Sequence, residues 1–226
     1  MLKLRPPDRH LYLIIFTALT LGLLSYLGFI QQLALRLELN LYIIITAIML
    51  IPLTTLIHIP IRRIQVIHAI PPTSVVGLII PKRSLYRGYT LITLNVGGAV
   101  LPASYSIILY LVFPIPTISL LIILLITTMV SFLLSRPIPG FGIGLPIFSV
   151  PIIAALTTHY LIDEYVISTA YIAATIGVML GADALRLLRP RDIQQLGSSF
   201  VSIGGAGILD SIVLTGFISI ILVSLF

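Results

Sequence analysis

The sequence predicts an all-α integral membrane protein with about seven transmembrane helices. Hydrophobic residues make up 58% of the 226 residues and charged residues only 9%, whereas soluble domains carry about 25% charged residues. Apolar stretches of roughly 20 residues, long enough to cross a hydrocarbon core of about 30 Å, recur along the chain. We therefore expect one membrane domain over residues 1–226, located in the cell (plasma) membrane as a multi-pass protein.

The expected spans are separated by charged segments or by Pro-containing turns. No charged residue occurs between Gly88 and Ser135, and Phe113-Pro-Ile-Pro116 is the turn that divides this stretch into two helices. The first span follows a basic segment but is too long for a cleavable signal peptide. The seven spans are predicted at residues 11–30, 41–59, 89–112, 116–134, 146–162, 166–188 and 201–226.

The distribution of positive charge predicts the orientation. Apart from Arg36, the Lys and Arg residues fall in the N-terminal segment or in or beside the loops at 60–88, 135–145 and 189–200. Seven spans place these segments on one side, and Lys and Arg favour the cytoplasmic side. The N-terminus is therefore predicted to be cytoplasmic and the C-terminus external. The expected partner is the lipid bilayer, with no nucleic acid, because the basic residues are scattered.

One of the cytoplasmic loops has a strand-turn-strand pattern. Two runs rich in β-branched residues flank Pro71-Pro72, which is typical of a small β-hairpin near residues 62–81. The loop at 136–146 mixes Pro and Gly with apolar residues. It fits either an ordinary connection or a partly re-entrant loop.

Two acidic residues are predicted to lie inside the spans. Asp183 and Asp210 fall on consecutive helices, and a rise of 1.5 Å per residue places them about 7 and about 13 Å below the cytoplasmic boundary. Asn95 falls at a similar depth, about 9 Å, in the third span. Because ionisable groups in hydrocarbon are costly, they mark functional sites. We predict Asp183, Asp210 and Asn95 as the catalytic candidates.

A purely structural role for these carboxyl groups is the alternative. Arg186 lies three residues after Asp183 and can pair with it on one helix face. Asp210 has no Lys or Arg in its own span, so it must be protonated, paired with another helix or exposed to water.

Glycine clusters accompany the polar residues. Glycines let helix backbones approach closely, which favours helix association in lipid, and they would give a substrate access to the backbone. Packing alone is the alternative explanation. The candidate glycines are Gly97, Gly98, Gly177, Gly181, Gly204, Gly205 and Gly207.

The sequence indicates no metal site and no cofactor. It contains no cysteine, so thiolate ligands and a cysteine nucleophile are excluded. His58 and His68 fall near the expected inner face and His159 near the outer face, so they do not form a ligand set. No phosphate-binding loop or zinc spacing is present.

Several motifs together resemble a family of polytopic membrane proteins from archaea and bacteria that is known only as a domain of unknown function. The motifs extend over residues 95–216. They are Asn95-Val-Gly-Gly-Ala-Val-Leu-Pro102, Arg136-Pro-Ile-Pro-Gly140, Gly181-Ala-Asp183 and Ser202-Ile-Gly-Gly-Ala-Gly207 followed by Leu209-Asp210. The resemblance implies a multi-pass membrane protein and supplies no activity.

The chain is also similar to the intramembrane aspartyl proteases of the presenilin and signal-peptide-peptidase type. Those proteins likewise carry two Asp residues on consecutive spans in the cytoplasmic half of the membrane. Here Asp210 follows Gly-Ala-Gly-Ile-Leu, whereas the family has Gly-x-Gly directly before its Asp, and Asp183 follows Gly-Ala where the family has Tyr. The similarity implies an Asp dyad.

Three functions are compatible with these residues. In the first, Asp183 and Asp210 form the dyad of an intramembrane aspartyl peptidase that cleaves a transmembrane peptide, because one carboxyl can act as base while the other donates a proton. In the second, they bind a proton or cation in a transporter or channel. In the third, the protein is a non-enzymatic assembly factor and the Asp residues fix helix packing.

Overall fold

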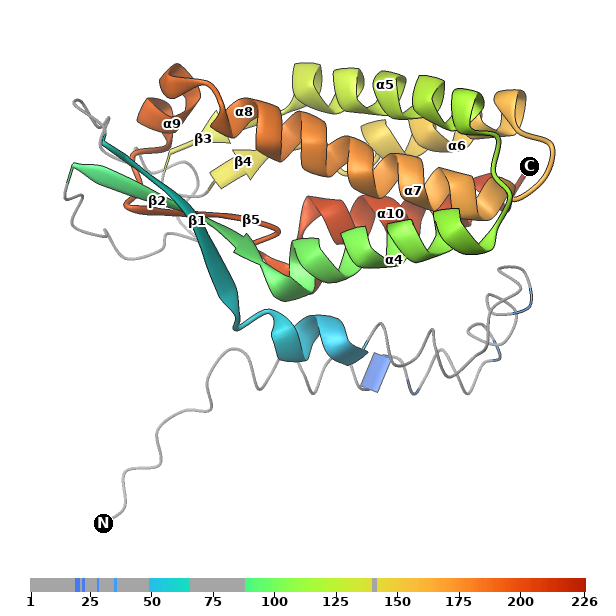
Figure 1. Cartoon of the computed structure of the whole chain (residues 1–226), viewed down its shortest axis with the longest axis horizontal. Helices are drawn as coiled ribbons and strands as arrows, with labels where there is room; N and C mark the ends of the chain where they lie inside the picture. Colours follow the sequence, from blue (N-terminus) through green and yellow to red (C-terminus); the bar gives the residue numbers. More distant parts are fainter. Residues whose placement is uncertain are drawn as a thin grey trace, which may run out of the picture.

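The computed structural model describes residues 49–65, 88–139 and 142–226, together with residues 19, 20, 22, 28 and 35. Five long helices run side by side along the longest axis of the molecule (Figure 1). They are α4 (Leu101–Val112), α5 (Thr117–Leu134), α6 (Ser149–Leu161), α7 (Val166–Val178) and α10 (Ser211–Val223). Two small sheets and the short helix α9 (Pro190–Leu196) lie at one end of this bundle, which we call the sheet end.

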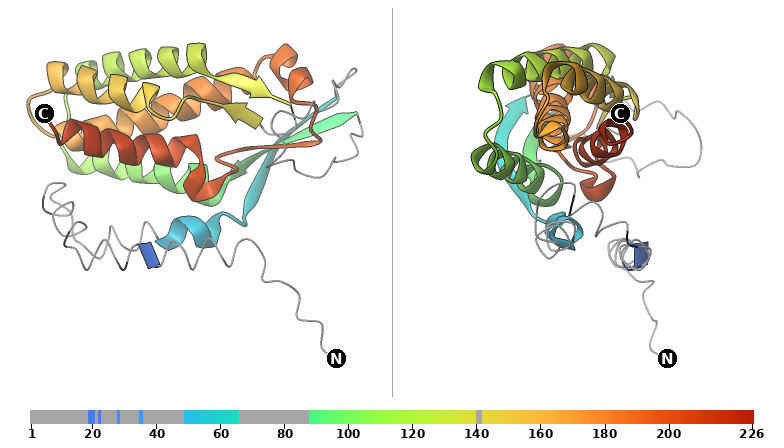
Figure 2. Two further views of the ribbon diagram at one scale, coloured as in Figure 1. Left: turned by 180° about the vertical axis from the view of Figure 1, so that it is seen from behind. Right: turned by 90° about the vertical axis from the view of Figure 1, so that its right-hand side faces the viewer.

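Helix α7 lies at the centre of the bundle, and the end-on view in Figure 2 shows α4, α5, α6 and α10 around it. The helix continues through the π-helical turn η2 (Met179–Ala184) into α8 (Leu185–Leu187), which gives a continuous helix of 22 residues. Buried small residues such as Ala170, Ala173 and Ala174 allow the neighbouring helices to approach closely. The central helix therefore determines where η2 ends and where the chain segments after it begin.

The larger sheet has the strand order β1–β2–β5. Strand β1 (His58–Gln65) is antiparallel to β2 (Tyr89–Asn95), and β2 is parallel to β5 (Phe200–Ile203). β2 leads directly into the π-helical turn η1 (Val96–Val100) and then α4, while β5 leads through a glycine-rich loop into α10. The sheet therefore fixes the starting points of two bundle helices next to each other.

The smaller sheet is a hairpin of β3 (Arg136–Ile138) and β4 (Gly142–Gly144). It follows α5 and leads into α6. The loop predicted at 136–146 is thus an antiparallel strand pair at the sheet end.

The prediction of an all-α protein with seven spans is wrong. In the described residues two continuous helices, Thr117–Leu134 and Val166–Leu187, are long and apolar enough to cross a membrane, and five strands form two sheets. The predicted span 89–112 begins with strand β2, and the predicted span 201–226 begins with strand β5. Hydropathy measures apolar content and does not distinguish a buried strand from a helix.

The predicted hairpin within residues 62–81 is wrong in its pairing. β1 begins at His58, before the predicted loop, and its partner is the more distant β2, with a register shift between Pro60 and Arg62. Residues 66–87 lie outside the described residues. So do most of the predicted span 11–30, residues 41–48 of the predicted span 41–59 and the predicted cytoplasmic N-terminus.

Hydroxyl groups and glycines hold α5 against the central helix. The Thr127 hydroxyl donates to the Ala173 carbonyl at 2.9 Å, and the Ser131 hydroxyl donates to the Gly177 carbonyl at 2.8 Å. A Cβ atom at Gly177 would lie 2.3 Å from the Thr127 hydroxyl oxygen. The small-residue positions of α7 therefore provide the close approach that these hydrogen bonds need.

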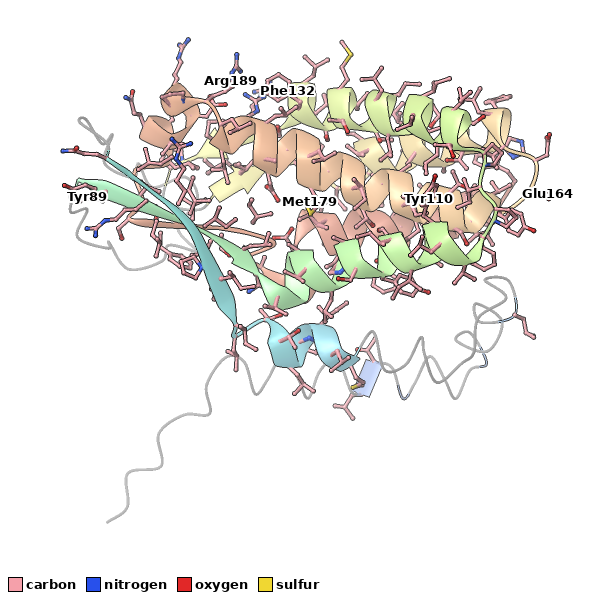
Figure 3. The ribbon with its side chains drawn as sticks, viewed as in Figure 1. Tyr89, Tyr110, Phe132, Glu164, Met179 and Arg189 are labelled. Atoms are coloured by element: carbon pink, nitrogen blue, oxygen red, sulfur yellow. The ribbon has the colours of Figure 1, made fainter. Side chains whose placement is uncertain are left out.

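The two ends of the bundle differ in charge. At the end opposite the sheets, which we call the far end, Asp163 and Glu164 connect α6 to α7. The Arg residues that the structure describes lie at the sheet end, on β1, β3, α8 and α9 or directly before α9: Arg62, Arg63, Arg136, Arg186, Arg189 and Arg191. Figure 3 shows Arg189 at the sheet end and Glu164 at the far end.

Candidate functional site

Asp183 lies in the π-helical turn η2, near the end of the central helix. It exposes 8% of its surface, and its carboxyl accepts a hydrogen bond from the backbone N–H of Gly204, in the loop after β5. On the α5 side, a Cβ atom at Gly181 would lie 2.2 Å from the Thr128 carbonyl oxygen. The glycine brings the helix against α5. Single π-helical turns of this kind occur frequently at functional sites.

Asp210 is the N-cap residue of α10. One carboxyl oxygen accepts from the backbone N–H of Ile212 at 3.0 Å, and the other accepts from the backbone N–H of Ala206 at 3.2 Å. The Ser211 side chain also hydrogen-bonds to the carboxyl. Burial raises the pKa of the Asp210 carboxyl, and these hydrogen bonds oppose the rise.

Both carboxyl groups line one cavity, and they are close enough for their charges to repel each other. The cavity has a volume of about 590 Å³, which is within the range of small-molecule and peptide side-chain sites. Its other polar lining comes from Ser198, Ser202, Ser211 and Thr215. Its apolar lining includes Ile138, Ile143, Leu145, Ile147, Leu187, Leu209 and Leu214.

Strand β5 contributes the edge of the larger sheet to the cavity wall. The Leu91 N–H donates to the Ser199 carbonyl at 2.9 Å, so in this parallel pair the backbone groups of Phe200 point away from β2. The Ser198 hydroxyl accepts from the Phe200 N–H at 3.3 Å and donates to the Phe200 carbonyl at 2.7 Å. The Ser198 side chain therefore already hydrogen-bonds to the N–H and carbonyl groups that Phe200 presents at the edge of the strand.

His58 and Asn95 lie behind this wall. The His58 Nδ1 atom is 2.9 Å from the Ser202 hydroxyl oxygen, and Ser202 lines the cavity. Burial lowers the pKa of His58. Asn95 is fully buried and does not line the cavity. Its amide oxygen accepts from the Gly98 N–H at 2.8 Å, so it caps η1.

Sequence reasoning missed the contact between His58 and Ser202. The two residues are 144 positions apart and become neighbours only because β1 and β5 flank the same central strand. The sequence gives a single signal for Ser202. It is a polar residue between Val201 and Ile203, which are buried.

The candidate glycines of the loop after β5 meet those of η1. A Cβ atom at Gly98 would lie 2.0 Å from the Gly204 carbonyl oxygen, and one at Gly207 would lie 2.5 Å from the Thr55 hydroxyl oxygen. Gly204 and Gly207 also have φ angles of 72° and 62°, which favour glycine. Gly97 likewise faces the backbone of Ile51 at 2.2 Å. These contacts fix the loop that carries Asp210.

Arg186 has partners other than the one considered from the sequence. Its guanidinium forms an ion pair with Asp192 at 3.2 Å and donates to the Phe132 carbonyl at 2.6 Å. It also donates to the Ser135 hydroxyl at 3.0 Å. The alternative that Arg186 neutralises Asp183 is therefore wrong. Arg186 instead caps the C-terminal end of α5, which leaves Asp183 to the cavity.

The arrangement suits proton transfer between two unlike carboxyl groups. Asp210 accepts hydrogen bonds at the positive end of a helix, which favours its ionised form. Asp183 is more deeply buried and has fewer donors, so the shared proton is better placed there. In the described part of the chain, three or more His, Asp or Glu side chains do not gather in a group that could hold a metal ion.

Comparison with known proteins identifies one family and no individual relative. Neither the curated proteins nor the solved structures contain a significant match to the chain. The family model described as "Protein of unknown function (DUF1614)" matches residues 52–222, which include both sheets, the cavity and the five bundle helices except the last residue of α10. The chain therefore belongs to the DUF1614 family.

Proposed function

We propose that this protein is a membrane-embedded aspartyl peptidase that uses Asp183 and Asp210. The observation that carries the proposal is that two carboxyl groups, from separate segments of the chain, line one cavity and interact electrostatically. Two carboxyl groups that interact in this way titrate as a pair and can share one proton. A pair in different environments can divide the roles of acid and base.

In the proposed reaction, the Asp210 carboxylate removes a proton from a water molecule. The resulting hydroxide attacks the peptide carbonyl carbon, while Asp183 donates its proton to the carbonyl oxygen. The tetrahedral intermediate then collapses as the C–N bond breaks and the amine leaves with the proton that Asp210 took from water. One hydroxyl group of the tetrahedral intermediate gives its proton back to Asp183 in this step. Both carboxyl groups thereby recover their starting states.

The substrate in this proposal is an extended stretch of polypeptide. β5 presents its edge to the cavity, and a peptide can add to a strand edge through backbone hydrogen bonds. Apolar residues such as Ile143, Leu209 and Leu214 would contact apolar side chains of the peptide.

A membrane location is the second part of the proposal. The outer face of α5 is apolar and exposed, with Ile118 77% and Leu125 70% exposed. Exposed apolar surface over a whole helix favours contact with lipid. The Arg residues of the described part of the chain gather at the sheet end, which favours a cytoplasmic location of this end in a multi-pass protein of the plasma membrane.

The test is proteolysis of co-expressed single-span membrane reporters by the parent and by Asp210→Asn. We expect the variant to lose about 10³-fold in cleavage rate, because it removes the base. Its fold should persist, since Asn is an equally good N-cap. Asp163→Asn, at an exposed carboxyl of the far end, is the matched control and should cleave as the parent does. Undiminished cleavage by Asp210→Asn would refute the proposal.

Ion transport with the same carboxyl groups is the competing function. A buried carboxyl pair on helices of low charge also suits binding of a proton or a small cation. Proton or sodium flux into liposomes that disappears in Asp210→Asn, without cleavage of any reporter by the parent, would favour transport. Loss of expression in both Asp→Asn variants, without activity in the parent, would favour an assembly role.

A further inference from the structure

The outer face of α5 carries an apolar stripe that ends at Phe132. Residues three or four positions apart share one face of a helix. At this spacing α5 carries exposed apolar side chains: Ile118, Leu121, Leu125 and Met129. Phe132 is next on the same face and is partly buried. At 1.5 Å per residue the stripe is about 21 Å long, which is longer than the hydrocarbon of one membrane leaflet, about 15 Å. An acyl chain can therefore lie along it.

A guanidinium group covers the end of this stripe. The guanidinium carbon of Arg189 lies 5.2 Å from the centroid of the Phe132 ring, and Figure 3 shows the two residues next to each other at the end of α5. The guanidinium carbon of Arg186 lies 4.6 Å from the centroid of the same ring. Aromatic rings attract cations in this geometry. The ring therefore places two positive charges where the apolar surface of α5 ends.

The two guanidinium groups differ in their partners. Arg186 pairs with Asp192 and donates to the Phe132 carbonyl and the Ser135 hydroxyl, so its donors are used inside the protein. The side chain of Arg189 is exposed, and it forms no ion pair or hydrogen bond with any residue of the described ranges. A guanidinium has five N–H donors and is always charged. Arg189 is therefore able to bind an anion from outside the described part of the chain.

The surroundings of Arg189 add both positive charge and apolar surface. Arg191 is exposed two positions later, and Arg136 is exposed at the start of β3, which follows α5 and contacts α9. Leu188, directly before Arg189, is also exposed. The acidic residue of this segment, Asp192, is already held in an ion pair. The end of α5 therefore combines uncompensated positive charge with exposed apolar side chains.

We infer that the end of α5 binds an anionic phospholipid, with the lipid phosphate at Arg189 and an acyl chain along the apolar stripe. The charge of this surface is complementary to an anionic headgroup, whereas a zwitterionic headgroup brings no net charge. Arg donates paired hydrogen bonds to phosphate oxygens. The inference rests on the membrane location proposed above and does not involve Asp183 or Asp210. It is therefore independent of the proposed proteolysis.

Lipid binding to the full chain in a neutral detergent is measured by native mass spectrometry. The probes are phosphatidylglycerol and phosphatidylcholine with identical oleoyl chains, so that the headgroup alone differs. We expect the parent to bind phosphatidylglycerol at least about fivefold more tightly than phosphatidylcholine. Arg189→Gln should weaken binding of phosphatidylglycerol about fivefold, which corresponds to about 1 kcal/mol. Its binding of phosphatidylcholine should stay within about twofold of the parent, because that headgroup has no net charge.

Two further variants separate the charge from the apolar stripe. Arg62→Gln is the matched control, because it removes the same charge from an exposed position of β1 at the sheet end. It should bind both lipids as the parent does. Met129→Gln places a polar group on the stripe, so it should weaken binding of both lipids by a similar factor. Circular dichroism during heating, in detergent without added lipid, checks that the variants are folded.

Equal affinity of the parent for the two lipids would overturn the inference, as would equal losses in Arg189→Gln and Arg62→Gln. Glycerophosphoglycerol, the headgroup without acyl chains, tests for a soluble phosphodiester instead of a lipid. We expect it to compete only weakly, and binding as tight as that of phosphatidylglycerol would overturn the inference.

The membrane location is tested separately by washing membranes with alkaline carbonate. Release of the protein would refute both the location and the lipid site. Retention of the protein, together with equal binding of the two lipids, would refute the lipid site alone. Retention with the expected preference for phosphatidylglycerol would support the lipid site whether or not the protein cleaves a reporter.

Discussion

The sheet end and the far end of the bundle stabilise the same helices in different ways. At the far end, Phe113, Ile115 and Tyr171 belong to one apolar cluster, and short turns join α4 to α5 and α6 to α7. At the sheet end, α4, α6 and α10 follow strands, glycines such as Gly204 and Gly207 adopt left-handed φ angles, and Arg186, which pairs with Asp192, caps α5.

This difference indicates that the far end serves as the scaffold, while the sheet end carries the candidate site. Regular apolar packing dominates the far end, whereas Asp210, Asn95 and Arg186 at the sheet end each have specific hydrogen-bond partners. Buried polar groups are stable only when they are hydrogen-bonded. The sheet end is therefore sensitive to single substitutions, and the predictions below compare it with the rest of the bundle.

The largest expected effect on stability is at Arg186. Arg186→Met removes the partner of buried Asp192 and the cap of α5 while keeping the apolar length of the side chain. Breaking a buried ion pair from one side costs about 3–5 kcal/mol, so we expect a loss of that size in chemical denaturation. Arg191→Met, at an exposed position of α9, is the control and should change stability by less than about 0.5 kcal/mol. Equal losses of unfolding free energy in both variants would show that Arg186 contributes no more to stability than Arg191.

Glycine substitutions test the two regions directly. A Cβ atom at Gly98 meets the backbone carbonyl of Gly204 in the site loop, whereas one at Gly177 meets the Thr127 side chain inside the bundle. Overpacking costs about 1–3 kcal/mol, and a backbone group yields less than a side chain. We expect Gly98→Ala to lower the melting temperature more than Gly177→Ala and to reduce cleavage as well. A larger loss in Gly177→Ala would reverse the comparison.

The pH dependence of cleavage tests the division of roles between the carboxyl groups. The base must be unprotonated, and burial raises the pKa of Asp210, so activity should fall on the acid side at a pH above the ordinary Asp value of about 3.9. Loss of the remaining shared proton should lower activity again at higher pH. A profile of kcat/KM against pH measures both limbs. An acid limb at or below about 3.9 would contradict the assignment of Asp210 as base.

The smallest effect is expected at Ser198, and it has the opposite sign. Ser198→Ala removes the hydroxyl that occupies the N–H and carbonyl of Phe200 at the β5 edge. These groups become available to a peptide, so binding of a fluorescein-labelled peptide rich in Val and Ile should improve about threefold. Fluorescence anisotropy with the Asp210→Asn protein measures the change. Weaker binding would indicate that the hydroxyl itself contacts the peptide.

The sequence singled out Asp183 and Asp210, which line one cavity in the structure, but it did not predict the fold. Asp183 and Asp210 were found because a carboxyl group within an apolar stretch is rare, and that signal is local. The seven-span fold failed in part because Tyr89–Asn95 and Phe200–Ile203 are uncharged and lead into apolar helices, so each strand was included in a predicted span. Pairing of β2 with β5 joins residues more than a hundred positions apart, and a local pattern contains no information on such pairs.

By itself, the sequence determined the low charge, the apolar helices, the two carboxyl groups and the glycines beside them, because each is a property of a short stretch of chain. The tertiary structure alone decided that Asp183 and Asp210 line one cavity, that Arg186 binds Asp192 and that His58 holds Ser202. These contacts depend on the packing of the central helix and on strand pairing over long separations. Such interactions form only when buried polar groups find partners in the folded chain.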